Sequence, residues 1–250
     1  MEAAPALLSI VIPVKDDFDG LSASLKALSA VRDAIEIVVV DGTDNTGDAI
    51  CNHFPSEPWH RLVVGAQTGV YDAMNAGAEA ALGLYVLFCG AGDCVKGDVL
   101  RKWLDAESGM AGTPHLHAFA VDMGKDREGG VPAVRRPRWN WRLNWQNTMH
   151  HQGMFLPRSW LMEEPFDAQF RVLADYHWAL KMWRAKRPIR LHGETLTQCA
   201  GAGLSRQFNR ALYLEEWKMK RGILPAWVLL GHLVWLPAKW AFKRLLNPAS

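Results

Sequence analysis

The sequence predicts an α/β protein with a mostly parallel sheet and helices on both faces. Two runs, Leu7–Val14 and Ile35–Val40, are mostly apolar and rich in β-branched residues, with Ser9 and Glu36 as their polar members, which is typical of strands buried on both faces. Strand-like and helix-like segments then alternate in short units. The 250 residues, 49% hydrophobic and 22% charged, suffice for one large α/β domain with an extension.

The elements of the first half follow from apolar periodicity. Leu7–Val14 is the first expected strand, and Gly20–Ala30 is the first expected helix because leucines recur in it at helical spacing. The other expected elements are a strand at Ile35–Val40, a short helix at Thr46–Phe54, a strand at Arg61–Val64, an alanine-rich helix at Val70–Leu82 and a strand at Tyr85–Cys89.

The second half begins with mixed patterns and ends in helices. His115–His117 alternates like a strand, another strand begins at Phe155, and Ala174–Ala185 is a tryptophan-rich helix. From Arg206 onward the pattern is that of amphipathic helices. We therefore expect a main domain at 1–205, with halves at 1–95 and 96–205, followed by a helical segment at 206–250.

Charge is distributed unevenly along the chain. Residues 1–130 contain 9 Lys and Arg against 19 Asp and Glu, whereas residues 131–250 contain 19 against 7. The basic second half therefore predicts an anionic partner.

The four cysteines show no C-x-x-C spacing, which favours reduced thiols over a zinc site or a disulfide framework. No basic leader precedes the first apolar run, so we expect a strand there and not a signal peptide.

Acidic residues follow three of the expected strands. Asp16 or Asp17 follows the first strand, Asp41 ends the second, and Asp93 ends the stretch LYVLFCGAGD after the fourth. Carboxyl ends of parallel strands share one edge of a sheet, where ligands bind. An ordinary turn explains each aspartate alone, but the coincidence of three favours a site. No G-x-G-x-x-G follows the first strand, which disfavours a nicotinamide dehydrogenase.

Three separated stretches resemble the family-two glycosyltransferases of GT-A fold, especially bacterial enzymes that use nucleotide sugars. The first is LLSIVIPVKDD with EIVVVDGTDNTGD, and the second is TGVYDAMNAGAEAALGLYVLFCGAGD. The third comprises MHHQGMF, FDAQFRVLADYHWALKM and GAGLS. The resemblance covers roughly residues 7–205 in family order, and it implies a nucleotide-binding half at 1–95 and an acceptor half at 96–205.

The resemblance implies roles for individual residues in binding a nucleotide-diphosphate sugar, with UDP or GDP as the nucleotide. Asp41 would hydrogen-bond the base or the ribose, and Asp72 and Asn75 would face the same ligand from one helix. The complete set that it implies for the donor is Pro13, Val14, Asp16, Asp41, Asp72, Asn75, Gly92 and Asp93. The Gly201–Ser205 turn either closes over the diphosphate or is a simple loop.

A divalent cation, Mn²⁺ or Mg²⁺, is also implied at Asp93. Such ions take oxygen ligands and need few protein carboxylates beside phosphates and water. Many relatives carry Asp-x-Asp where this chain has Gly90-Ala91-Gly92-Asp93, so metal dependence is an open question. His151 is the candidate for a further ligand or diphosphate donor. Adjacent His150 cannot face the same site if the segment is extended.

Asp175 is the candidate catalytic base, which would take the proton of the acceptor hydroxyl. At about 100° per residue, Asp175 lies on the apolar side of its helix, opposite His177, Lys181 and Arg184. An unused charge is costly at an inward position. The alternative is a helix N-cap, for which aspartate is well suited.

The basic, tryptophan-rich second half predicts contact with an acceptor or a membrane. Ile223–Leu236 is 14 residues of nearly unbroken apolarity flanked by lysines and arginines, too short to span a bilayer but suited to its interface. The alternative is that these helices pack on the protein's own core or on a second copy in a homo-oligomer. The candidate acceptor or membrane residues are Arg136, Arg138, Trp139, Trp141, Trp227 and Trp235.

The resemblance thus implies a metal-dependent, inverting glycosyltransferase for cell-surface polysaccharide synthesis. Its expected acceptor is a glycan, or one linked to polyprenyl diphosphate, and its expected location is the cytoplasmic, inner face of the cell membrane. Nucleic acid is not an expected partner, because no nucleic-acid module surrounds the arginines. The rival hypotheses are a nucleotidyltransferase and a catalytically inactive glycan-binding or membrane scaffold.

Overall fold

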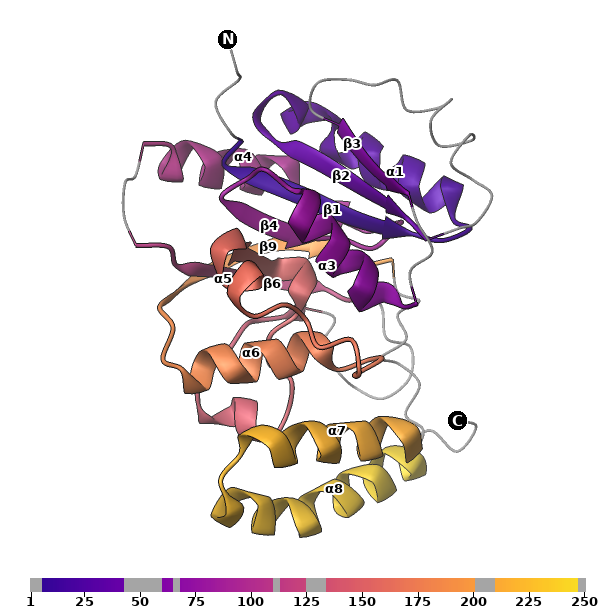
Figure 1. Ribbon diagram of the computed structural model, residues 1–250, viewed down its shortest axis with the longest axis vertical. Coiled ribbons are helices and arrows are strands. Elements are labelled where there is room, and N and C mark those ends of the chain that lie inside the picture. The colour runs from indigo at the N-terminus through magenta and orange to yellow at the C-terminus, as the bar shows by residue number, and fades with distance from the viewer. Residues whose placement is uncertain are drawn as a thin grey trace.

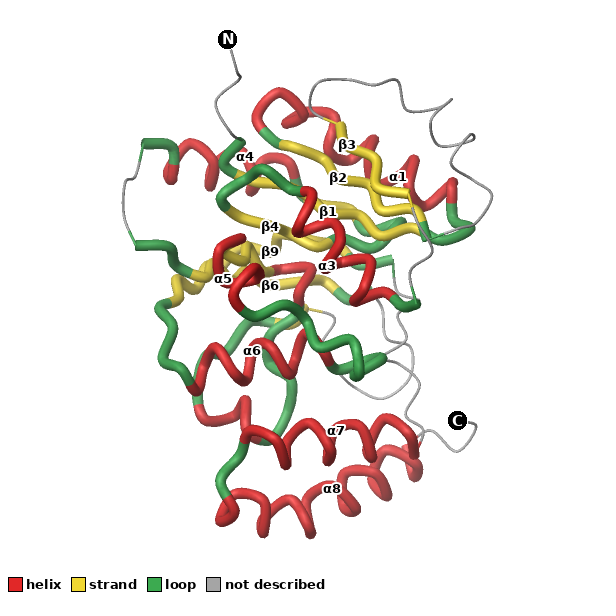
Figure 2. Tube along the Cα trace, viewed as in Figure 1, coloured by secondary structure: helices red, strands yellow, loops and turns green. Residues whose placement is uncertain are grey.

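The computed structural model describes residues 6–42, 60–64, 68–109, 113–124, 134–200 and 210–246, and the side chains only as far as residue 240 at the C-terminal end. The expected helix at Thr46–Phe54 and the turn at Gly201–Ser205 lie outside these ranges. Strands gather in the upper part of the molecule and a pair of helices forms its lower end (Figure 1, Figure 2).

The described strands form one curled sheet whose first half is parallel. In spatial order they are β3 (His60–Val64), β2 (Glu36–Asp41), β1 (Leu8–Val14), β4 (Tyr85–Phe88), β8 (Met154–Pro157), β6 (Leu116–Asp122), β9 (Ile189–Gln198) and β5 (Cys94–Val95), with β7 (Val134–Arg135) beside β6. Pairing from β3 to β4 is parallel, and β8 runs antiparallel to both of its neighbours. The predicted α/β architecture is confirmed.

Strands β1, β2 and β4 are buried on both faces, as their mostly apolar sequences predict. On β1, Leu8, Ile10 and Ile12 enter one core together with α1 (Phe18–Leu28) and α4 (Gly97–Glu107). Val11 enters the other core, with α3 (Val70–Ala80), α5 (Arg158–Glu163) and α6 (Ala174–Arg184). Side chains alternate between the two faces of a strand, so a strand covered on both faces needs mostly apolar residues. The buried polar pair on these strands is satisfied internally, because the Ser9 hydroxyl donates to the Glu36 carboxylate.

Close packing of α3 on the sheet depends on one glycine. A Cβ at Gly77 would lie 2.3 Å from a methyl carbon of Val11 and 2.9 Å from one of Val40. Any side chain there would push α3 away from β1 and β2. Because Tyr71, Asp72 and Asn75 lie on the same helix, this contact also fixes their distance from the sheet.

The C-terminal part is a helical hairpin of α7 (Arg210–Ile223) and α8 (Ala226–Leu246). Figure 1 shows α7 beneath α6 and α8 outside α7. The apolar run Ile223–Leu236 does not form one continuous helix, because Leu224 and Pro225 separate α7 from α8. Three short 3₁₀ helices complete the described elements: Ser29–Ala34, Trp141–Asn144 and His151–Gly153.

Candidate active site

The carboxyl ends of β1, β2 and β4 lie at the same edge of the sheet. Val14 pairs with Asp41 at the ends of β1 and β2, and the Gly42 amide donates to the Val14 carbonyl at 2.9 Å. After β4, the Cys89 amide donates to the Val11 carbonyl at 3.0 Å. Asp41 and the turn that carries Asp93 therefore flank β1 on one edge, and both carboxylates are buried.

Asp93 is held by backbone amides in a tight turn. Its Oδ2 accepts the Gly90 N–H at 2.8 Å, and its Oδ1 accepts the Ala200 N–H at 2.9 Å. Burial raises the pKa of Asp93. The two amides and the neighbouring charge of His151 act in the opposite direction but do not outweigh burial. No salt bridge to Asp93 occurs among the described side chains. Each carboxylate oxygen keeps capacity for a further ligand, so this anion suits a cation.

The turn before Asp93 is fastened to the start of α1. Gly92 has a φ of 87°, in the left-handed region that favours glycine, and its amide lies 2.9 Å from both the Gly20 carbonyl and the Ser24 hydroxyl. Asp17 caps α1, since its Oδ1 accepts the Gly20 N–H at 2.9 Å. Asp16 is exposed with a φ of 52°. Of the two post-strand aspartates, Asp17 is therefore the structural one.

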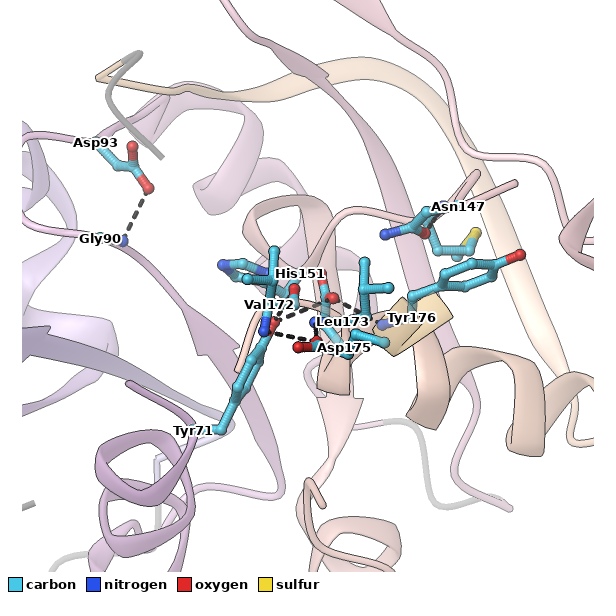
Figure 3. A network of polar contacts seen from close by, with 11 residues as sticks. Tyr71, Gly90, Asp93, Asn147, His151, Val172, Leu173, Asp175 and Tyr176 are labelled. Atoms are coloured by element: carbon cyan, nitrogen blue, oxygen red, sulfur yellow. Dashed lines mark hydrogen bonds and ion pairs between the residues drawn. The ribbon is translucent and has the colours of Figure 1, made fainter. Parts of the chain in front are cut away.

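Asp175 is the centre of a buried polar network. Its Oδ2 lies 2.9 Å from His151 Nδ1, and its Oδ1 accepts the Tyr176 N–H at 2.7 Å. The Tyr71 hydroxyl lies 3.2 Å from Oδ1 and 2.8 Å from the Val172 carbonyl. Figure 3 shows these side chains converging, with Asp93 and Gly90 apart from them. The expected inward orientation of Asp175 is confirmed, because the residue is only 7% exposed.

The alternative that Asp175 is a helix N-cap is wrong. The N-cap of α6 is Leu173, and Asp175 lies in the first turn of the helix. Burial alone would raise the pKa of Asp175, but the His151 hydrogen bond, the nearby histidine charges and the Tyr176 amide outweigh it and lower the pKa below its usual range. Burial and the Asp175 charge raise the pKa of Tyr71 well above its usual value. Asp175 is thus an anion and Tyr71 a neutral donor at neutral pH.

Two residues of this network, Tyr71 and Glu215, carry no role in the sequence-based prediction. Glu215, on α7, has an Oε1 that accepts the amides of Val172 at 2.9 Å and Leu173 at 2.8 Å, just before α6. A carboxylate at the N-terminal end of a helix also interacts favourably with the positive end of the helix dipole. One sequence feature could have pointed to Glu215: Glu215 and Glu216 are the only acidic residues in the basic segment 210–246.

The other expected donor residues on α3 have protein partners. Both ends of the Asn75 amide bond the backbone of Phe166, at 2.8 and 3.0 Å, so Asn75 holds the segment that leads to α6. Asp72 accepts a hydrogen bond from the Thr68 hydroxyl. Asp72 and Tyr71 also line a cavity of about 330 Å³, together with Arg171, Val172 and Glu215. Their contacts with a nucleotide stay a prediction, as do those of Pro13, Val14, Asp16 and Asp41.

The expected acceptor or membrane residues occupy two adjoining regions. Arg136 and Arg138 are exposed in the segment after β7, Trp139 packs against the core, and Trp141 is exposed. Trp227 and Trp235 lie on α8. The regions meet where the Trp145 ring contacts Gly231 and stacks, tilted, on His232 with ring centroids 4.5 Å apart.

Within the part of the chain that the structure describes, no group of three or more His, Cys, Asp and Glu side chains is placed to hold a metal ion. Asp93 nevertheless fits a cation that takes most of its ligands from phosphate and water, because it offers two partly used oxygens and forms no ion pair with any side chain that the structure describes. The Nδ1 of His151 is occupied by Asp175, which leaves Nε2 as the nitrogen that can meet a ligand.

Comparison with known proteins gives consistent matches. The model of glycosyl transferase family 2 matches residues 9–112. A PGL/p-HBAD biosynthesis glycosyltransferase of Mycobacterium bovis (strain BCG / Pasteur 1173P2) is 31% identical over 194 residues, covering 72% of this chain and 70% of the relative. A protein of the same description from Mycobacterium tuberculosis (strain ATCC 25177 / H37Ra) matches equally well.

Two solved structures share the fold. S. aureus TarS 1–349 in complex with UDP-GlcNAc has a TM-score of 0.61 at 15% identity, covering 85% of this chain and 65% of that chain. Mannosyltransferase PcManGT from Pyrobaculum calidifontis, in complex with GDP-Man and Mn2+, has a TM-score of 0.56 at 17% identity, covering 96% and 65%. This chain thus spans less than two thirds of either structure. The fold is GT-A, and the chain belongs to glycosyl transferase family 2.

Proposed function

We propose that this glycosyltransferase moves a sugar from a nucleotide-diphosphate donor to an acceptor hydroxyl, with inversion at the anomeric carbon. The observation that carries the proposal is the pair of buried carboxylates, Asp93 and Asp175. Their surroundings shift the two pKa values in opposite directions, raising that of Asp93 and lowering that of Asp175. No described side chain forms an ion pair with Asp93, whereas the neighbours of Asp175 keep that carboxylate ionised. Direct displacement needs a charge sink for the leaving group and a base for the nucleophile.

The chain's own residues divide this work. Asp175, on α6, takes the proton of the acceptor hydroxyl as that oxygen forms its bond to the anomeric carbon. The bond from that carbon to the donor's phosphate oxygen breaks at the same time, and the nucleoside diphosphate leaves with the electron pair. His151 and Tyr71 orient the Asp175 carboxylate, and Glu215 holds the backbone that precedes it.

The donor is supported by the fold neighbours, which bind UDP-GlcNAc and GDP-Man. Asp41 would meet the nucleoside from the end of β2, and the Gly92–Asp93 turn would meet the diphosphate. A divalent cation, Mn²⁺ or Mg²⁺, would be held by Asp93 with phosphate oxygens and water, and His151 Nε2 is the further candidate ligand. When bound, it would neutralise charge on the leaving diphosphate.

The proposed acceptor is a glycan, free or linked to polyprenyl diphosphate, at the cytoplasmic face of the cell membrane. Exposed Arg136, Arg138 and Trp141 support it, because guanidinium groups pair with phosphates and indole rings stack on sugars. The relatives are named for PGL/p-HBAD biosynthesis, which is consistent with an acceptor outside nucleic-acid metabolism.

A donor screen tests the proposal. Thermal unfolding would be followed with a panel of UDP- and GDP-sugars, with and without Mn²⁺, and the stabilising donor would then be tested for turnover. We expect one nucleotide class to raise the unfolding temperature more strongly when Mn²⁺ is present. If no nucleotide sugar stabilises the protein or is consumed, the inactive scaffold is favoured and the proposal fails.

A further inference from the structure

The outer side of the C-terminal hairpin, α7 and α8, carries an exposed apolar stripe. Trp227 is 74% exposed, Leu230 66% and Val234 74%, and their spacing of three and four residues aligns them along α8. Exposed Leu233 and Leu214 widen the stripe across the groove between the two helices. Contiguous exposed apolar patches are rare on surfaces that meet only water, so this one indicates an interaction surface.

The acidic residues of the hairpin are turned away from this surface. Residues 210–246 contain seven basic and two acidic residues, and both of the acidic ones face the protein. Glu215 accepts the Val172 and Leu173 amides, while Glu216 is buried between Lys220 at 2.7 Å and Lys239 at 2.8 Å. The outer surface is therefore left with apolar and basic side chains.

Basic residues flank the stripe. Arg210, Lys218 and Arg221 are exposed on α7. On the neighbouring 3₁₀ segment, Trp141 is 60% exposed and the Arg142 guanidinium lies 5.6 Å from the centre of its indole ring. The exposed apolar side chains of the hairpin, Trp227 among them, together with its exposed cations match the chemistry of an anionic bilayer interface. Of the helices that the structure describes, none is long and apolar enough to cross a membrane.

We infer that the outer face of the α7–α8 hairpin docks in the plane of a bilayer that contains anionic phospholipids. Trp227, Leu230 and Val234 would enter the boundary between headgroups and acyl chains, with the exposed lysine and arginines among the headgroups. A second copy of this chain fits less well, because a two-fold contact through this face would bring like charges together. The inference concerns membrane attachment alone and does not depend on the donor, the acceptor or the catalytic roles.

Vesicle flotation of the full chain tests the inference. Vesicles of phosphatidylcholine alone would be compared with vesicles that also contain phosphatidylglycerol, at low and high salt. We expect the protein to float with the anionic vesicles and much less with the neutral ones. High salt should weaken binding without abolishing it, because the apolar contribution is not screened.

A matched pair of variants locates the surface. Trp227→Ser/Leu230→Ser removes exposed side chains from α8 and should lower vesicle binding about ten-fold or more. The control, Leu82→Ser/Leu84→Ser, removes two leucines that are similarly exposed, 58% and 62%, in the loop between α3 and β4, and should bind as the unchanged protein does. Lys218→Gln/Arg221→Gln should lower the ratio of binding to anionic vesicles over binding to neutral vesicles by roughly three-fold or more.

Three outcomes would overturn the inference. The full chain may fail to float with anionic vesicles, or Trp227→Ser/Leu230→Ser may bind them as well as the control does. Alternatively, size-exclusion chromatography with light scattering may show a dimer that only the α8 variant dissociates, which would assign the stripe to a second copy. Circular dichroism of each variant would establish that it is folded before its binding is compared.

Discussion

Two carboxylates of this molecule are almost equally buried and yet differ in charge environment. Asp93, after β4, is 5% exposed, and its hydrogen bonds within the described part of the chain come from backbone amides, so burial raises its pKa. Asp175, on α6, is 7% exposed, but His151 and its other donors lower its pKa despite burial. Burial alone therefore does not decide the ionisation of a carboxylate; its partners do.

The difference matches the two tasks proposed for these carboxylates. An anion without a cationic partner gains from binding a metal ion or from protonation, so Asp93 suits a ligand that arrives with its own cation. An anion already supported by a histidine and a tyrosine stays ionised and oriented, as a base must. The first task depends on a turn at the sheet edge, and the second on packing between α3, α6 and α7.

The largest effect is expected for Asp175→Asn. The amide keeps the size of the side chain but cannot accept the acceptor's proton, so turnover should fall by about 100-fold or more while donor binding stays near normal. Steady-state kinetics and calorimetric titration of the donor would measure the two quantities. Turnover like that of the unchanged enzyme would remove Asp175 from the mechanism.

A smaller effect is expected for Glu215→Ala. It leaves the Val172 and Leu173 amides without their carboxylate and should cost about 1–3 kcal/mol in the free energy of unfolding. Turnover should fall with little change in the donor KM, because the backbone before Asp175 is loosened. In Glu215→Gln the amide oxygen can still accept the hydrogen bonds of the two backbone amides. This variant should therefore retain most of the stability and most of the turnover.

The control for this experiment is Glu163→Ala on α5, which removes a surface ion pair with Arg187. Such pairs typically contribute about 0–1 kcal/mol, so urea denaturation should show a small change and turnover should not move. Equal losses in Glu215→Ala and Glu163→Ala would refute the positioning role of Glu215.

The smallest effect concerns pH. A base with a lowered pKa remains deprotonated as the pH falls, so kcat/KM should show no acid limb from Asp175 down to about pH 5. His151→Gln removes the main partner that lowers the pKa of Asp175, and it should move the acid limb to higher pH. An acid limb near neutral pH in the unchanged enzyme, where histidines titrate, would instead assign proton acceptance to an imidazole.

The parallel half of the fold could be predicted from sequence, because β1, β2 and β4 are buried on both faces and are mostly apolar. Strand β9 was not predicted, since IRLHGETLTQ is polar and half exposed and becomes a strand through pairing with β6. Most of the C-terminal apolar run forms the first part of α8 in the structure. Its division into two helices follows from Pro225, which cannot donate a backbone hydrogen bond.

The site was predictable where helix phase or a motif sufficed. The inward position of Asp175 followed from its helical phase. Its partnership with Tyr71 joins residues 104 apart in the chain, and the Glu215 contact with Val172 joins residues 43 apart. No local pattern encodes such contacts. The hydrogen bond between Asp175 and His151 Nδ1 was not predicted either, and the expected role of His151 as a metal ligand or diphosphate donor stays a prediction.

The division of labour between the two carboxylates is tested most directly by titrating UDP and GDP, with and without Mn²⁺, into the unchanged protein, Asp93→Asn and Asp175→Asn. The account predicts that Mn²⁺ strengthens binding of one nucleotide to the unchanged protein and to Asp175→Asn, and that Asp93→Asn loses this dependence on Mn²⁺. Binding that depends on Mn²⁺ in Asp93→Asn, or loses that dependence in Asp175→Asn, would contradict it.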